Sequence, residues 1–222
     1  AMMCAPAAWA GKGNPNPRVI PPGAHAFGKS YAEWSAEWWK WHLSLPATDH
    51  PAFSADGADC ALGQSGKVWF LAGAFTTEFP LNDFNTIERE SCVVPVGKAI
   101  FFPIINISCS TVEAEPYRLD ADCSDAEECP CATNFTDGTY AIIEDLSLEI
   151  DGRTLNVSEA YHTASSTVFD FEFSDPDDNI LGVDCEIEDC DNARALSDGY
   201  WIMLPPLSRG EHTIQFTGSF RD

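Results

Sequence analysis

An acidic segment in the second half of the chain carries the oxygen-rich side chains that calcium ions prefer. Asp175, Asp177, Asn179 and Glu186 stand at positions 1, 3, 5 and 12 of a calcium-binding loop. Ile180 occupies position 6, where an EF-hand requires glycine, and the flanking sequence favours strands over helices. Both features argue against an EF-hand. Two interpretations stay open: a calcium site of another kind in a loop between strands, and a solvated acidic loop.

The five histidines could supply imidazole ligands to zinc or copper. His25, His42, His50, His162 and His212 contain no HxH or HxxxH pair, so only the fold could bring them together. The chain has no GxSxG, no GxGxxG and no P-loop, and its 35 acidic residues cannot be sorted into a glycosidase pair without geometry. A secreted polysaccharide-active hydrolase or metal-dependent enzyme is therefore the alternative to a non-catalytic protein.

Two tryptophans are candidates for stacking on a sugar ring. Trp69 and Trp201 lie in predicted strands, where alternate side chains can face solvent. The competing interpretation places both indoles in the core. The four tryptophans between residues 34 and 41 recur at helical spacing, which favours a core face for them.

The stretch from Ser30 to Pro46 predicts one aromatic, amphipathic helix that packs on a sheet. Ser30 followed three residues later by Glu33 forms a capping box at its start. Pro46 ends the helix because proline lacks an N–H and clashes with the preceding turn. The predicted apolar face contains Tyr31, Trp34, Trp38, Trp41 and Leu45.

Most of the remaining chain favours strands. Residues 1–29 are rich in proline and glycine and predict an extended arm, followed by a single domain over residues 30–222. Strands are expected at 67–75, 92–94, 99–106, 146–150, 154–157, 169–173, 200–204 and 212–216, with Pro103 at an edge or bulge and Asp151-Gly152 in a hairpin turn. Residues 108–139 predict an acidic, cysteine-rich loop stapled by disulfides. The pattern indicates a mainly β antiparallel sandwich or jelly roll, whose last strand is either an edge or completed by another chain.

Composition places the protein outside the cell. A net charge of −23 argues against nucleic acid or an anionic membrane as partner, and no apolar run approaches the ~18 residues that span a bilayer. Nine cysteines without paired CxxC motifs favour disulfides over zinc and leave one thiol unpaired, for which Cys4 is the candidate. Glycosylation sequons at Asn106, Asn134 and Asn156 fit a secretory route. The start at Ala1 predicts a signal peptide that was removed or replaced.

Four motifs resemble a family of exported bacterial proteins. They are YAEWSAEWWKW at 31–41, GQSGKVWFLAG at 63–73, CVVPVGKAIFFPIIN at 92–106 and PLSRGEHTI at 206–214. This chain differs from that family in its cysteine-rich loop and in lacking a further C-terminal strand. The resemblance implies export, a single domain and a Cys60–Cys92 disulfide, and it brings no activity.

Together these observations predict a secreted, non-catalytic extracellular binding or assembly module, completed by strand exchange and with calcium as its candidate ion. The expected partners are further copies of the chain, another extracellular protein or a polysaccharide.

Overall fold

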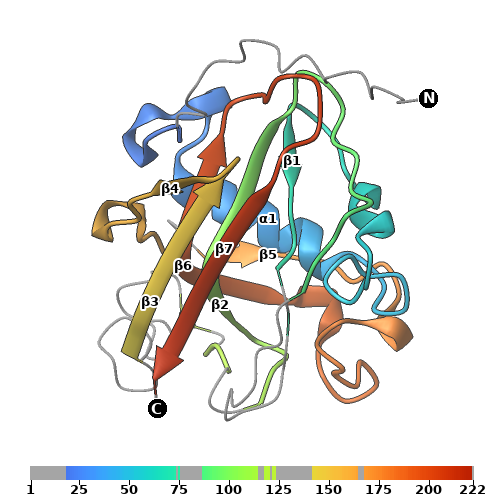
Figure 1. The fold of residues 1–222 in the computed structure, drawn as a ribbon. Coiled ribbons are helices and arrows are strands. Elements are labelled where there is room, and N and C mark those ends of the chain that lie inside the picture. Colours follow the sequence, from blue (N-terminus) through green and yellow to red (C-terminus); the bar gives the residue numbers. More distant parts are fainter. Residues whose placement is uncertain are drawn as a thin grey trace, which may run out of the picture.

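Two β-sheets and one long helix form three layers in the computed structural model, which describes residues 19–73, 75, 87–114, 118–120, 122–123, 142–164 and 168–221 (Figure 1). The central sheet has the order β1-β2-β6-β5, and the second sheet has the order β4-β3-β7. The helix covers one face of the central sheet, and the second sheet packs against the other face. The prediction of a mainly β, sandwich-like fold with one helix is therefore confirmed.

The strands differ widely in length. The central sheet contains β1 (Val68–Phe70), β2 (Ala99–Ser110), β6 (Arg194–Leu204) and β5 (Phe169–Asp170). The second sheet contains β4 (Arg153–Leu155), β3 (Ile142–Ile150) and β7 (Ile214–Arg221). Short 3-10 turns occur at Pro22–Ala24, Ala26–Gly28, Ala58–Ala61, Glu159–Tyr161, Pro176–Asp178 and Cys190–Asn192. No helix in this described part of the chain is both long and apolar enough to cross a membrane.

The two central strands are buried on both faces, which explains their almost continuous apolar sequence. On β6, Trp201 and Met203 belong to the core beneath the helix, whereas Ile202 and Leu204 belong to the core between the sheets. Phe101 on β2 stacks on Trp201, with ring centroids 5.3 Å apart. A register shift follows Pro103, so the predicted bulge is present.

Helix α1 (Tyr31–Leu43) begins as its sequence predicts. Ser30 Oγ accepts from the Glu33 N–H at 3.2 Å, and the Glu33 carboxylate accepts from the Ser30 N–H at 2.7 Å, which completes the capping box. Three indole N–H groups then bind the surrounding loops: Trp34 donates to Ala26 O, Trp38 to Leu71 O and Trp41 to Leu62 O. The aromatic face is thus interior, and its polar atoms hold the helix in register.

Several predicted strands are shorter or arranged differently. The strand expected over 67–75 is reduced to β1, which pairs with β2 in parallel. Residues 92–94 form no strand. The alternating phenylalanines at 169–173 yield only the two residues of β5, although the Phe171 N–H still donates to the Ala193 carbonyl at 3.1 Å and all three rings pack in the core beneath the helix. The Asp151-Gly152 hairpin is confirmed, with φ values of 52° and 74°.

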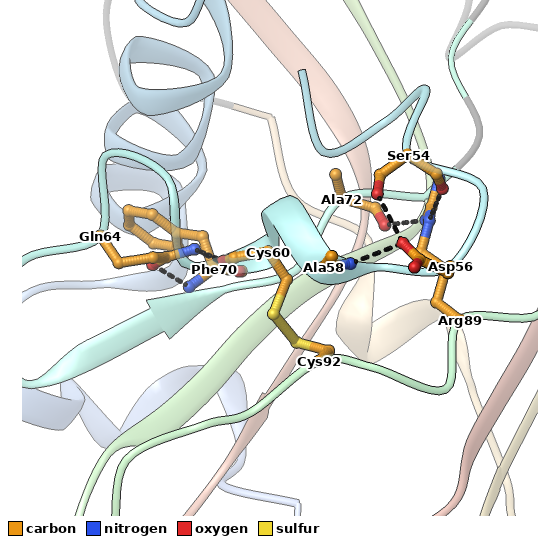
Figure 2. The surroundings of a disulfide bond; sticks show 9 residues. All are labelled: Ser54, Asp56, Ala58, Cys60, Gln64, Phe70, Ala72, Arg89 and Cys92. Carbon is orange, nitrogen blue, oxygen red and sulfur yellow. Dashed lines mark hydrogen bonds between the residues drawn. A yellow bond between two sulfur atoms is a disulfide. The ribbon is translucent and has the colours of Figure 1, made fainter. Parts of the chain in front are cut away.

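A disulfide joins the loop after α1 to the segment before β2, as the resemblance implied. Figure 2 shows Cys60 bonded to Cys92, with Cα atoms 5.6 Å apart. Next to it, the Arg89 guanidinium donates to backbone carbonyls of Ser54, Ala52 and Ala72 at 3.0, 2.7 and 2.7 Å. The Arg89 guanidinium therefore donates hydrogen bonds to loop carbonyl groups that have no partner in a strand ladder.

Candidate functional site

The most unusual surface of the molecule is the outer edge of β7. This strand lies at the margin of the second sheet and pairs with β3 on one side (Figure 1). Just before β7, the Asp151 N–H donates to the Thr213 carbonyl at 2.9 Å, and the register continues with Glu149 opposite Gln215. Because hydrogen bonding alternates along an antiparallel ladder, the N–H and C=O groups of Ile214, Phe216 and Gly218 point away from β3. Within the described ranges, no hydrogen bond to these outward groups is present.

The sequence of β7 carries few of the devices that protect an edge strand. Natural edges are blocked by charges, by proline or by a bulge in the edge strand itself. Residues 213–220 contain no charge and no proline, in a chain with 47 charged residues, 35 acidic and 12 basic. The alternation is regular: Ile214 and Phe216 pack into the core between the sheets, while Gln215 and Thr217 are exposed. The result is an open and uncharged template for another strand.

A histidine cluster holds the start of β7 against the β3–β4 turn. His212 Nδ1 lies 2.8 Å from Asp151 Oδ2, and Asp151 Oδ1 accepts from the Thr213 N–H at 3.0 Å. His212 Nε2 lies 3.0 Å from the Ser208 carbonyl oxygen and 3.2 Å from Ser208 Oγ. Burial lowers the pKa of His212, but the Asp151 and Ser208 hydrogen bonds and the Asp151 charge outweigh it, so the pKa is raised.

Ser208, His212 and Asp151 are connected as in the triad of a serine hydrolase. The hydrogen bonds of the histidine, however, favour a different protonation state of its ring. A general base must present an unprotonated nitrogen to the serine hydroxyl. The Asp151 carboxylate and the Ser208 carbonyl can only accept hydrogen bonds, so they favour a His212 ring protonated at both nitrogens. An imidazolium cannot take a proton from Ser208. The arrangement therefore fits a structural clamp on β7 better than a nucleophile.

A second histidine lies between two carboxylates beside the middle of β6. His162 Nε2 is 2.7 Å from Asp198 Oδ1, and His162 Nδ1 is 3.2 Å from Glu159 Oε1. Tyr200 donates to Glu159 at 2.5 Å and stacks on the His162 ring. The hydrogen bond that His162 donates to Asp198, which is 4% exposed, raises the pKa of His162 more than burial lowers it. Both ring nitrogens are again occupied, so this group joins the Glu159 turn to β6.

The third histidine site is interior. The His42 side chain is 1% exposed and packs against Trp38, Trp39 and Phe75, and neither ring nitrogen has a hydrogen-bond partner. Burial, followed by the neighbouring His50, lowers the pKa of His42 far below its ordinary value. His42 is therefore a neutral core residue on α1.

The structure does not gather the residues predicted as calcium ligands. Asp175 Oδ1 accepts from the Asp177 N–H at 3.0 Å and caps a 3-10 turn. The Asn179 side chain, 8% exposed, closes the loop by bonding the Val183 N–H and C=O. Glu186 is exposed in a loop that the Cys185–Cys190 disulfide closes. Among the residues with described positions, no group of three or more His, Cys, Asp or Glu side chains is arranged to hold a metal ion. The calcium hypothesis gains no support.

The sugar-stacking candidates lie in the core. Trp69 is 5% exposed and Trp201 is 0% exposed, so neither indole offers a face to a sugar ring. Trp201 is instead sandwiched between Phe101 and Trp38. The alternation that can expose one strand face does not do so here, because both faces of β2 and β6 are covered.

The three sequons have different outcomes. Asn156 is exposed in the loop after β4. Asn106 lies in β2 and its amide nitrogen is buried, so the folded chain cannot present it for glycosylation. Asn134 lies outside the described residues, as does Cys4, the predicted unpaired thiol. Cys109 and Cys123 are disulfide-bonded.

Sequence reasoning found β7 as an open strand but missed the histidine–carboxylate clusters. The His212–Asp151 contact joins residues 61 positions apart, and only the hairpin turn at Asp151 hinted that β7 would return beside it. The Asp198–His162 pair depends on β6 being central, which its sequence did not specify.

Comparison of the chain with protein-family models, with curated proteins and with solved structures gave no match in any of the three.

Proposed function

We propose that this chain is a non-catalytic extracellular binding or assembly module that engages its partner by strand addition at β7. The observation that carries the proposal is the outward row of backbone groups at Ile214, Phe216 and Gly218, within residues 213–220, which contain no charge and no proline. A strand added there would pair with these groups and extend the second sheet.

Other features support this proposal over an enzyme. His162 and His212 have both ring nitrogens hydrogen-bonded to acceptors, and His42 is buried away from solvent. The disulfides Cys60–Cys92 and Cys185–Cys190 are typical of an oxidising compartment, which is the setting proposed here. A rigid, stapled scaffold with one open edge is suited to assembly outside the cell.

A labelled strand-forming peptide tests the proposal. The probe is Lys-Thr-Val-Thr-Val-Thr-Val-Lys, and its control carries proline at the central valine, which removes an N–H while keeping the charge. Fluorescence anisotropy at physiological salt should show saturable binding of the probe, and binding at least about tenfold weaker of the control, because one lost edge bond costs about 1.4 kcal/mol.

The matched protein variants are Ile214→Pro and Ile214→Ala. Both remove the isoleucine side chain, but only proline removes the outward N–H, and proline is tolerated at the first position of a strand. Ile214→Pro should bind the peptide about tenfold more weakly than Ile214→Ala. Equal binding of the two peptides, or of the two variants, would show that β7 is not the binding edge.

A further inference from the structure

We propose that the strand accepted by β7 is the β7 of a second copy, which pairs antiparallel about a two-fold axis at Phe216. This inference rests on the proposed function and names its partner. It joins two three-stranded sheets into one continuous sheet of order β4-β3-β7 and then β7-β3-β4 of the second copy. Such an interface is isologous, since each copy contributes the same residues.

The pairing register follows from the direction of the backbone groups. Outward residues must lie opposite outward residues, because only these have N–H and C=O groups directed at the neighbour. A register centred on Phe216 places Phe216 opposite its own copy and Ile214 opposite Gly218 of the second copy. All three outward residues are then hydrogen-bonded in both chains. A shift by two residues in either direction leaves an outward residue at the end of the row without its partner.

The charges allow a second copy to approach at β7. Each chain carries a net charge of −23, which opposes association through most surfaces. Residues 213–220 carry no charge, so two β7 strands can approach each other without direct like-charge contact.

The side chains on the two faces are also compatible. On the exposed face, Gln215 of one copy lies beside Thr217 of the other, which is a polar pair. On the inner face, Gly218 has no room for a side chain of its own: a Cβ would come within 2.6 Å of Ile105 Cβ. The glycine therefore lets β7 pack against β2, and it leaves the position opposite Ile214 of the second copy free of a competing side chain.

Light scattering after size-exclusion chromatography tests this inference on the full chain over a range of protein concentrations. The wild type should form a dimer, and Ile214→Pro should weaken the dimer about a hundredfold relative to Ile214→Ala, because it removes one outward N–H from each copy and each lost hydrogen bond costs about 1.4 kcal/mol. Circular dichroism and the melting temperature of each variant confirm that it folds.

A wild type that stays monomeric at every concentration overturns the second-copy inference. A dimer that Ile214→Pro weakens no more than Ile214→Ala does overturns it as well.

The two proposals fail differently. Binding of the strand-forming peptide by a strictly monomeric wild type would retain β7 as a binding edge and exclude only the second copy. A dimer in a protein that does not distinguish the two peptides would point to another interface and overturn both.

Discussion

The two ring nitrogens of the buried His42 side chain make no hydrogen bond with the described residues. Both of its nitrogens are without partners inside an aromatic cluster on α1. The adjacent His50 differs: its Nδ1 accepts from the Ala52 N–H at 3.0 Å, and its Nε2 lies 2.9 Å from the His42 carbonyl oxygen. His50 therefore bridges two backbone groups, whereas His42 only fills space. An unpartnered buried polar group lowers stability, so His42 is a position where stability can be gained.

We predict that His42→Phe raises the free energy of unfolding by about 1 kcal/mol at pH 7, because it replaces two unpartnered nitrogens by carbon in an aromatic site. The effect should grow below pH 6.5. The depressed pKa of His42 means that the unfolded chain binds a proton there while the folded chain does not. Stability is therefore present above the unfolded pKa and lost as the pH falls, by up to about 1.4 kcal/mol per pH unit.

Urea titrations of both proteins between pH 5 and pH 8 measure this difference. His50→Phe is the control, and it should destabilise the protein because it removes both backbone hydrogen bonds. A His42→Phe protein with the wild-type pH dependence would contradict the assignment of His42 as a buried neutral base.

For single residues, the sequence indicated local features better than the contacts that a side chain makes with distant parts of the chain. The resemblance implied the Cys60–Cys92 disulfide, which is present. His212, in contrast, was predicted on the apolar face of the last strand, yet it precedes β7 and binds Asp151. Side chains that meet across long stretches of chain depend on register, which local patterns do not encode.

At the scale of elements, the Cys60–Cys92 disulfide supports a region with little regular structure. Its two cysteines are 32 positions apart, and the described residues between them contain the end of one 3-10 turn and β1. The Cys185–Cys190 disulfide closes only five residues. Cross-links stabilise chiefly by restricting the unfolded chain, and the effect grows with the length of the closed loop.

Removing the longer cross-link should therefore cost more. We expect Cys60→Ala/Cys92→Ala to lower the free energy of unfolding by about 4 kcal/mol and Cys185→Ala/Cys190→Ala by about 2 kcal/mol. Guanidinium titrations of the two double variants provide the measurement. Equal losses, or a larger loss for the short loop, would show that strain or local packing outweighs the chain-entropy effect.

Elements with strong local sequence features were predicted most accurately. The capping box set the start of α1, and Asp151-Gly152 set the β3–β4 hairpin. The boundaries of β1 and β5 were missed because their lengths depend on neighbours. β1 pairs with β2 over only three residues although β2 continues to Ser110, and β5 pairs with β6 over only two residues although Phe169 and Phe171 both pack in the core. Apolar content identified these segments as buried but could not separate strand from irregular core.

Charge dominates at the scale of the whole molecule. A net charge of −23 in a 24.3 kDa chain creates self-repulsion that the compact state increases. The partial compensation is local, as in the Lys29–Glu37 pair at 3.0 Å and the Arg118–Glu188 pair at 3.5 Å. Such exposed pairs contribute little.

Screening should consequently stabilise the fold. We predict that raising sodium chloride from about 10 mM to about 300 mM increases stability by about 1 kcal/mol, which is a rise of about 2–4 °C in melting temperature for a domain of this size. Differential scanning calorimetry at constant protein concentration, with Ile214→Pro included as the variant expected to weaken self-association, separates screening within the chain from association. A melting temperature that falls with salt would show that favourable ion pairs outweigh the repulsion.

The pairing of β2 with β6 in the central sheet also determines when the chain can complete its fold during synthesis. During synthesis, α1, β1 and β2 leave the ribosome long before the strand that must lie beside β2 exists. The tryptophans and phenylalanines of these elements stay exposed until β6 has been made. The pairing of β2 with β6 joins segments that are far apart in the sequence. Contacts between segments far apart in the sequence slow folding, and they prolong the lifetime of aggregation-prone intermediates with exposed apolar surface. Maturation therefore depends on the last third of the polypeptide, and a truncated product would be a substrate for chaperones and proteases instead of a partly active protein.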